Sequence, residues 1–277
     1  MWIACPRIWG MAMTELRPCP SCDSTEATKW EAYSQDPWHV ARCSGCDLTY
    51  LRNPVPYTAL EEDFAWEKTY EEKKTKTGGS TALSPAIRNA RKRLRLTHKG
   101  KQKRMGVWFN NGKVLDIGCG DLMNVPEPMI PFGIELSRAL HEFADAQMRA
   151  RGGYCVHGAG AEVIWDFEPD TFDGVIMHSY LEHEIDLMGV LRGVWRAVKP
   201  GGAVFVRVPN FGSINRRVVG PKWCGFRYPD HVSYFTLDTL RTAAKRAGFT
   251  TELINRVGLP VDDNIKALLR KPAVAMP

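Results

Sequence analysis

The sequence predicts an α/β fold, in which a doubly wound and mostly parallel sheet follows a small cysteine-rich module. From Lys113 to about Gly248, short apolar runs alternate with helix-like stretches, which is the pattern of right-handed βαβ units. Near the start of the chain, cysteines occur in two pairs, each enclosing two residues. We therefore expect a cysteine-rich module over residues 16–55, a charged helical linker over 56–105 and an α/β domain over 106–277.

The composition is that of an ordinary globular protein, with 44% hydrophobic residues and a formal net charge of +6. No apolar stretch reaches the ~20 residues that a membrane-spanning helix needs. The apolar start of the chain is too short for a secretory signal. The 8 cysteines without such a signal indicate a reducing, cytoplasmic environment and favour metal binding over disulfides.

A basic run lies at the end of the expected linker. It consists of Arg91, Lys92, Arg93, Arg95, Lys99, Lys101, Lys103 and Arg104, with no acid among them. Such a run can recruit partners that carry phosphate, including nucleic acid, but it is more often a solvated helix face. We expect the solvated face.

The paired cysteines have the spacing of a zinc ribbon. Cys19 and Cys22 form one pair, Cys43 and Cys46 form the other, and 20 residues separate the pairs. Four thiolates complete a tetrahedral Zn²⁺ site without an open position, so the ion is expected to be structural. Redox dithiols and unligated core cysteines are the alternatives. The module could clamp a substrate, contact a partner or brace the domain.

A glycine turn directly follows the first apolar run of the α/β domain. The run Val114-Leu115-Asp116 reads as the end of a buried parallel strand, and Gly118 and Gly120 follow it. Glycine lets the backbone turn sharply and lets a ligand come close. Because open α/β sheets bind ligands at the carboxyl ends of their strands, this turn is a candidate cofactor cradle.

An acid follows the next apolar run at the position where ribose hydroxyls are bound. Glu135 ends that run, and a carboxylate roughly twenty residues past a glycine turn accepts hydrogen bonds from ribose. Dinucleotide sites have a third glycine that allows close helix packing. Here residues 121–123 are Asp, Leu and Met, which disfavours a pyrophosphate cradle.

Four motifs in this order resemble class I S-adenosylmethionine-dependent methyltransferases, in particular the small-molecule enzymes of the UbiG-like, type 11 and type 23 kinds. The motifs are VLDIGCG, GIELS, FDGVIMHSYLEH and LRGVWRAVKPGGAVFVRVPN. The resemblance covers roughly residues 110–250 and implies a Rossmann-like sheet that binds S-adenosylmethionine. One departure is that Asp121 and Leu122 stand where the family often has threonine and glycine.

The resemblance also implies which residues bind the cofactor. Asp116, Gly118 and Gly120 would line its methionine part, and Glu135 would take the ribose hydroxyls. The whole expected set is Asp116, Gly118, Cys119, Gly120, Glu135, Leu136, Gly160, Ala161, Glu162 and His178. Of these, residues 160–162 would contact the adenine, and His178 would lie near the sulfonium and the substrate.

A long, aromatic-rich insertion over residues 209–236 is expected to cap the active site. His231 within it is the first candidate for the catalytic base, because histidine titrates near neutral pH, and His178 and His183 compete with it. An equal alternative is that His231 only ties down the insertion. The aromatic residues could form a wall near the sulfonium or the insertion's own core; they are Trp223, Tyr228, Tyr234 and Phe235.

The C-terminal edge is the least regular part of the pattern. Thr236 is expected to start an amphipathic helix that stops at Gly248, and a sixth strand is expected over 251–254. Residues 262–270 look helical, and the seventh strand usual in such folds is not evident; residues 273–275 are a weak strand candidate.

We expect the protein to transfer a methyl group to a small-molecule or glycan-type acceptor, most often on oxygen, with nitrogen or carbon as variants. The alternative is an rRNA or tRNA methyltransferase whose zinc module and basic run contact RNA. A third hypothesis is a binding protein that keeps the fold and has lost the chemistry.

Overall fold

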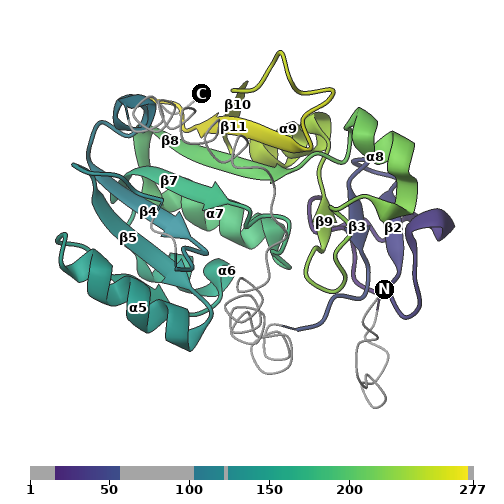
Figure 1. Cartoon of the computed structure of the whole chain (residues 1–277), viewed down its shortest axis with the longest axis horizontal. Coiled ribbons are helices and arrows are strands. Elements are labelled where there is room, and N and C mark those ends of the chain that lie inside the picture. The colour runs from purple at the N-terminus through teal and green to yellow at the C-terminus, as the bar shows by residue number, and fades with distance from the viewer. Residues whose placement is uncertain (1–15, 57–102, 122–123, 274–277) are drawn as a thin grey trace, which may run out of the picture.

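The computed structural model describes residues 16–56, 103–121 and 124–273. Most of the expected linker and the basic run up to Lys101 lie outside these residues. The described part contains two sheets, a seven-stranded one and a four-stranded one, which lie side by side in Figure 1. None of its helices combines the length and the apolar character that crossing a bilayer requires.

The large sheet is mostly parallel, as the sequence predicts. Its strands, in chain order, are β4 (Lys113–Ile117), β5 (Ile130–Glu135), β6 (Cys155–His157), β7 (Phe172–His178), β8 (Val198–Pro209), β10 (Thr250–Leu253) and β11 (Asn264–Arg270). Their spatial order is β10-β11-β8-β7-β4-β5-β6. The five strands from β4 to β8 pair in parallel, whereas β11 is antiparallel to both β8 and β10.

The prediction of a helix over 262–270 is wrong, because this segment contains β11. The strand pairs with β8 along its whole length, from Asn264 opposite Pro209 to Arg270 opposite Ala203. The run of apolar residues at 267–269 fits a helix as well as a strand. Burial on both faces of the sheet decides it, since Ala267, Leu268 and Leu269 are all buried. The seventh strand is therefore present as β11. Of the weak strand candidate at 273–275, the structure describes only residue 273, which is not in a strand.

Helices cover both faces of the large sheet. On one face, α7 (Leu187–Ala197) and α9 (Leu237–Arg246) pack in a core that includes Leu115, Val175 and Val204. On the other face, helical residues 103–108 cover the side chains that alternate with these, among them Val114 and Ile176. The sheet is therefore doubly wound.

The remaining helices are short or lie at the edge of the sheet. Helix α5 (Arg138–Arg149) packs on β5 and β6, at the lower left of Figure 1. The others are α6 (Gly160–Val163), α8 (Ile214–Val219) and the 3₁₀ turns η1 (Glu31–Tyr33), η3 (Ile164–Asp166) and η4 (Gly220–Lys222). Helix α9 begins as predicted, since the Thr236 hydroxyl accepts from the Thr239 amide, and it ends before Gly248 with φ of +95°.

The small sheet joins the cysteine module to the insertion. The module contributes β1 (Ala27–Lys29), β2 (Val40–Cys43) and β3 (Thr49–Leu51), and the insertion contributes β9 (Ser233–Tyr234). Strand β9 pairs antiparallel with β3, so the order is β1-β2-β3-β9. Two segments that are almost two hundred residues apart in the chain thus share one sheet (Figure 1).

The aromatic residues of the insertion form a core with the module rather than an open wall. Trp223 and Tyr234 are buried, and Phe235 is buried in the main core. Tyr33 of the module stacks on Phe226 of the insertion, with ring centroids 4.8 Å apart. The insertion is therefore anchored by contacts to the module.

Arg17 connects three parts of the chain. Its guanidinium donates to the carbonyl oxygens of Leu51 in the module at 2.9 Å, of Ile185 after β7 at 2.7 Å and of Val232 in the insertion at 3.2 Å. Burial lowers the pKa of Arg17 to about 10, so the group keeps its charge at neutral pH. A charged donor therefore satisfies carbonyl groups from three segments at one point.

Replacing Arg17 by methionine should lower the free energy of unfolding by about 3 kcal/mol, because three carbonyls lose a charged donor. Urea denaturation of the two proteins measures the difference. The control is Arg42→Met, which removes an exposed guanidinium paired with Asp47 and should cost below about 1 kcal/mol. Equal losses in the two variants would contradict a bridging role for Arg17.

Candidate cofactor and acceptor site

The glycine turn lies at the carboxyl end of β4 and has the backbone conformation that glycine favours. Gly118 has φ of +68° and Gly120 has φ of +57°. A Cβ built on Gly120 would meet none of the described residues within 4 Å, so the backbone there faces open space among them. A ligand can therefore approach the peptide groups of this turn closely.

Glu135, at the end of β5, braces the same turn. Its Oε2 accepts a hydrogen bond from the Gly120 amide at 2.8 Å, and its Oε1 accepts from the Ser137 amide at 2.9 Å. The side chain is 8% exposed. Each carboxylate oxygen has a further lone pair, so the group can still accept from two hydroxyls of a ribose. Glu135 is thus placed both to shape the turn and to bind a diol.

Asp116 lies at the base of the turn, fully buried. Its Oδ2 accepts from the backbone amide and the side-chain amide of Asn124, at 3.2 and 3.1 Å. These bonds hold the segment after the turn against the end of β4.

Cys119 lines the turn with its backbone alone. Its side chain points away from the turn, and its sulfur lies 3.7 Å from that of Cys155 in a buried cluster. The contact with Cys155 and burial hold the pKa of the Cys119 thiol well above its usual range. Any role in cofactor binding therefore belongs to the peptide group of Cys119.

Tyr180, which the sequence reasoning did not single out, crosses the expected cofactor site. A Cβ on Gly118 would lie 2.8 Å from its ring, and one on Gly160 would lie 2.1 Å from its hydroxyl oxygen. The hydroxyl donates to the carboxylate of Glu184, which is buried. Both glycines are needed to leave room for this ring, and Tyr180 borders the expected methionine and adenine parts of the cofactor site.

The expected adenine contacts begin helix α6. Gly160 and Ala161 are buried at its start, Glu162 is exposed, and Leu136 after β5 is half-buried. The acid at the end of β4, the open glycine turn and the braced acid at the end of β5 provide the space and the acceptors that S-adenosylmethionine needs. The residues present fit that cofactor.

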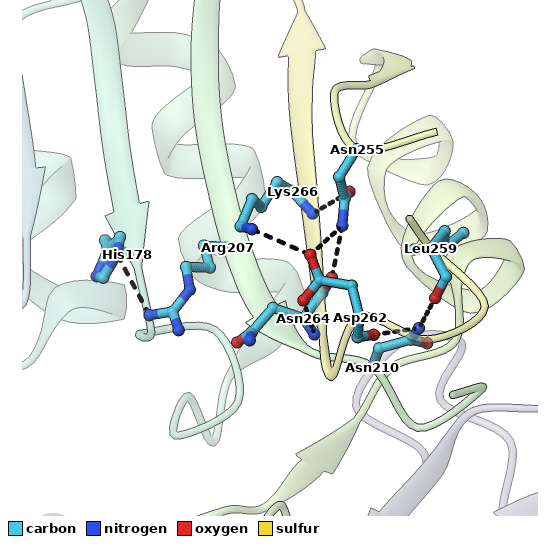
Figure 2. Close-up of polar contacts among 8 residues, drawn as sticks. All are labelled: His178, Arg207, Asn210, Asn255, Leu259, Asp262, Asn264 and Lys266. Atoms are coloured by element: carbon cyan, nitrogen blue, oxygen red, sulfur yellow. Dashed lines mark hydrogen bonds and ion pairs between the residues drawn. The ribbon is translucent and has the colours of Figure 1, made fainter. Parts of the chain in front are cut away.

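His178 and Arg207 meet at the ends of β7 and β8. Figure 2 shows the guanidinium of Arg207 directed toward the imidazole, with Nη1 3.3 Å from Nε2 of His178. The same Nη1 donates to the hydroxyl of Ser179 at 3.0 Å. Since a guanidinium can only donate, Nε2 of His178 accepts and the imidazole is neutral. Arg207 forms no ion pair with any described residue. It is the second functional candidate, after Tyr180, that the sequence did not single out.

Asn210 fixes the start of the insertion beside this pair. Its side-chain amide donates to the carbonyls of Leu259 at 2.9 Å and Asp262 at 3.1 Å (Figure 2). In the same picture Asp262 contacts Asn255 and Lys266, which closes a polar network at the start of β11. The end of β8 is therefore rigidly positioned.

His183 and His231 lie together in a buried place at the root of the insertion. Nδ1 of His183 is 2.9 Å from the carbonyl of Asp230, and Nδ1 of His231 is 2.8 Å from that of Gly225. Burial lowers the pKa of His183 to about 3 and that of His231 to about 4. His231 is only 5% exposed, whereas His178 is half-buried at the strand end.

The four cysteines of the module converge as the spacing predicts. All four sulfurs lie within 4.8 Å of one another, with Cys19 and Cys46 at 3.5 Å and Cys22 and Cys43 at 3.4 Å. Four sulfurs at about 2.3 Å from one zinc ion are separated by distances close to these. The cluster has the donor set and the size of a tetrahedral thiolate site.

The strand order, the glycine turn after β4 and the acid at the end of β5 define the class I S-adenosylmethionine-dependent methyltransferase fold. A solved S-adenosylmethionine-dependent methyltransferase from Archaeoglobus fulgidus has the same fold, with a TM-score of 0.51 and 16% identity over 64% of this chain and 94% of that chain. The methyltransferase-domain family profile matches residues 86–254, more than half of the chain. The chain belongs to the methyltransferase-domain family.

The curated relatives are similar to this chain over a shorter stretch than the family profile is. The ubiquinone biosynthesis O-methyltransferase of Pseudomonas fluorescens SBW25 is 37% identical over 112 residues, which cover 38% of this chain and 45% of that protein. The enzyme of the same name from Pseudomonas putida F1 is 34% identical over 110 residues, with the same coverage. This chain thus spans less than half the length of the curated relatives it matches.

Replacing Glu135 by alanine should weaken S-adenosylmethionine binding by about 10- to 100-fold, because a charged acceptor of two hydroxyls is lost and the turn loses its brace. Isothermal titration calorimetry measures the change. The matched control is Glu168→Ala, an exposed acid remote from the turn, which should bind as the wild type does. Unchanged affinity in the Glu135 variant would contradict the assignment.

Proposed function

We propose that this protein transfers the methyl group of S-adenosylmethionine to a hydroxyl oxygen of a small-molecule or glycan-type acceptor. The observation that carries the proposal is the pair formed by His178 and Arg207 at the ends of neighbouring strands, a neutral imidazole beside a guanidinium that makes no ion pair with any described residue. Similarity to ubiquinone biosynthesis O-methyltransferases supports oxygen as the methylated atom.

The cofactor-binding residues would hold and orient the methyl donor. Glu135 would accept from the ribose hydroxyls, and the turn at Gly118 and Gly120 would let the backbone contact the methionine part. Leu136 and residues 160–162 would border the adenine. When bound, S-adenosylmethionine supplies an electrophilic methyl group on its sulfonium.

The acceptor side needs a base and a stabiliser of negative charge. His178 would take the proton of the acceptor hydroxyl, since its imidazole is already in the neutral form. Arg207, which donates to Ser179 and His178, would shift its hydrogen bonds to the oxygen as negative charge develops there. His231 fits the alternative role of tying down the insertion, because it is buried, it is bonded to Gly225 within the insertion, and its ring contacts that of His183 in the loop after β7.

The module and the insertion would bind the rest of a larger acceptor. A cavity of about 830 Å³ opens between them, with Trp30, Arg42 and Thr49 on the module side and Phe211 and Arg217 on the insertion side. An aromatic face among hydrogen-bonding side chains suits a hydroxylated, glycan-type molecule. Of the roles open to the module, these walls favour clamping the substrate.

The test is methyl transfer from isotopically labelled S-adenosylmethionine to a panel of phenols, catechols and glycosides. Mass spectrometry of the products identifies the methylated atom. A methyl ether from a hydroxylated acceptor supports the proposal. Products methylated only on nitrogen or carbon, or no product with any hydroxylated compound, would overturn it.

Replacing His178 by glutamine should lower kcat by about 100-fold, because the acceptor proton loses its base. The affinity for S-adenosylmethionine should fall far less than kcat, which calorimetry checks alongside the transfer assay. The control is His39→Gln in the module, away from the strand ends, with wild-type kcat expected. A kcat close to that of the wild type in the His178 variant would show that His178 is not the base.

We also infer that Cys19, Cys22, Cys43 and Cys46 bind a structural Zn²⁺. The sulfur separations support this, as does the short length of the strands β1, β2 and β3, whose apolar core is small. The ion would brace the module on which β9 of the insertion pairs. The sulfurs of the cluster leave a bound zinc ion no open position for substrate.

Replacing Cys22 by serine should remove one molar equivalent of zinc and lower the melting temperature, because a ligand of the closed site is lost. Elemental analysis and a thermal melt measure the two effects. Cys224→Ser serves as the control, since Cys224 is exposed and outside the cluster. Equal zinc content in the two variants would refute zinc binding by the module.

A further inference from the structure

Glu182, His183 and His231 form a second group of potential metal ligands, apart from the cysteines. One ligand atom from each lies within 4.8 Å of the others. Glu182 and His183 come from the loop after β7, and His231 comes from the insertion. The group therefore joins two segments that are almost fifty residues apart at the root of the insertion.

The two imidazoles are held in the state that ligates metals. Each Nδ1 lies at hydrogen-bond distance from a backbone carbonyl, of Asp230 for His183 and of Gly225 for His231. A carbonyl only accepts, so each Nδ1 carries the proton and Nε2 is the nitrogen that can ligate. Histidines that bind metals almost always donate their other N–H in this way, to a carbonyl or a carboxylate.

The carboxylate of Glu182 lacks the partner that a buried acid needs. The residue is 1% exposed, and its Oε2 has no hydrogen-bond partner among the described residues. No arginine or lysine of the described part forms an ion pair with it. Burying a carboxylate without a directly bonded cation is costly, although the charges of Arg207 and Arg227 act on Glu182 from farther away. A divalent cation at this point would satisfy the orphaned oxygen.

The backbone around the group is already fixed. The carbonyl oxygen of Glu182 accepts from the amides of Val232 at 2.7 Å and Ser233 at 3.2 Å. The two histidine rings meet edge to face, with centroids 4.6 Å apart. The residue that carries the carboxylate is thus bonded to the segment that follows His231, which preorganises the three ligands.

From this geometry we propose that Glu182, His183 and His231 bind one divalent first-row transition ion. Two imidazoles and one carboxylate form the donor set that Zn²⁺, Fe²⁺ and Mn²⁺ use in proteins. Three protein ligands leave at least one position for water. The ion would fasten the insertion to the loop that follows β7 and carries Tyr180, so its role is one of positioning. This site is independent of the proposed methyl transfer and of the cysteine site.

The test is the metal content of the full-length protein, loaded separately with Zn²⁺, Fe²⁺ or Mn²⁺, desalted and analysed by mass spectrometry of the elements. Wild type should hold two equivalents of the preferred ion or ions, and Glu182→Gln should lose one. That variant keeps the volume of the side chain, and a thermal melt confirms that it folds. His231→Gln should lose the same equivalent, and Cys22→Ser should keep it.

The control is His141→Gln, a histidine that pairs with His157 outside the group and should keep both equivalents. Cobalt spectra separate the two sites, because only the cysteine site gives thiolate charge-transfer bands. Loss of the weaker visible bands in Glu182→Gln, with the thiolate bands kept, supports the proposal. Metal content and spectra that are identical in wild type and Glu182→Gln would overturn it.

Discussion

The contact on which the acceptor side of the molecule depends is the guanidinium of Arg17. One charged group satisfies carbonyls of the cysteine module, of the loop after β7 and of the insertion. Half-burying such a charge is costly, and its hydrogen bonds together with the ring of Tyr50 at 5.7 Å offset that cost. The three segments are far apart in the chain, so the relative position of the strand-end loop and the insertion rests on this junction and on the pairing of β9 with β3.

The cofactor side is built differently, from neighbours in sequence. The turn after β4 and the acid after β5 belong to adjacent parallel strands, whose carboxyl ends meet by the geometry of the βαβ unit. Glu135 connects the two strand ends, because its carboxylate accepts a hydrogen bond from the Gly120 amide. Tyr180 then links this side to the acceptor side, since its ring touches the glycine turn and its own loop continues to Glu182 and His183.

Patterns of neighbouring residues were sufficient to predict the features that depend on short stretches of the chain. The cysteine spacing predicted the convergence of four sulfurs, and Thr236 and Gly248 predicted the ends of α9. The C-terminal segment 262–270 was misread because its apolar residues fit two periodicities, and only pairing with β8 selects the strand. Tyr180 and Arg207 lie inside the third and fourth methyltransferase-like motifs, yet a motif by itself does not show which of its side chains point into a site.

The sequence by itself determined the alternation of strands and helices from Lys113 to about Gly248, the glycine turn with the acid at the end of the next strand, and the convergence of the four cysteines. These follow from residues close in the chain or from strands whose adjacency is fixed by short connections. Tertiary structure alone decided that His178 meets Arg207, that His231 is buried beside His183 and Glu182, and that the module shares a sheet with the insertion. Each of these contacts joins distant segments, and packing around a common core, rather than local backbone preference, brings such segments together.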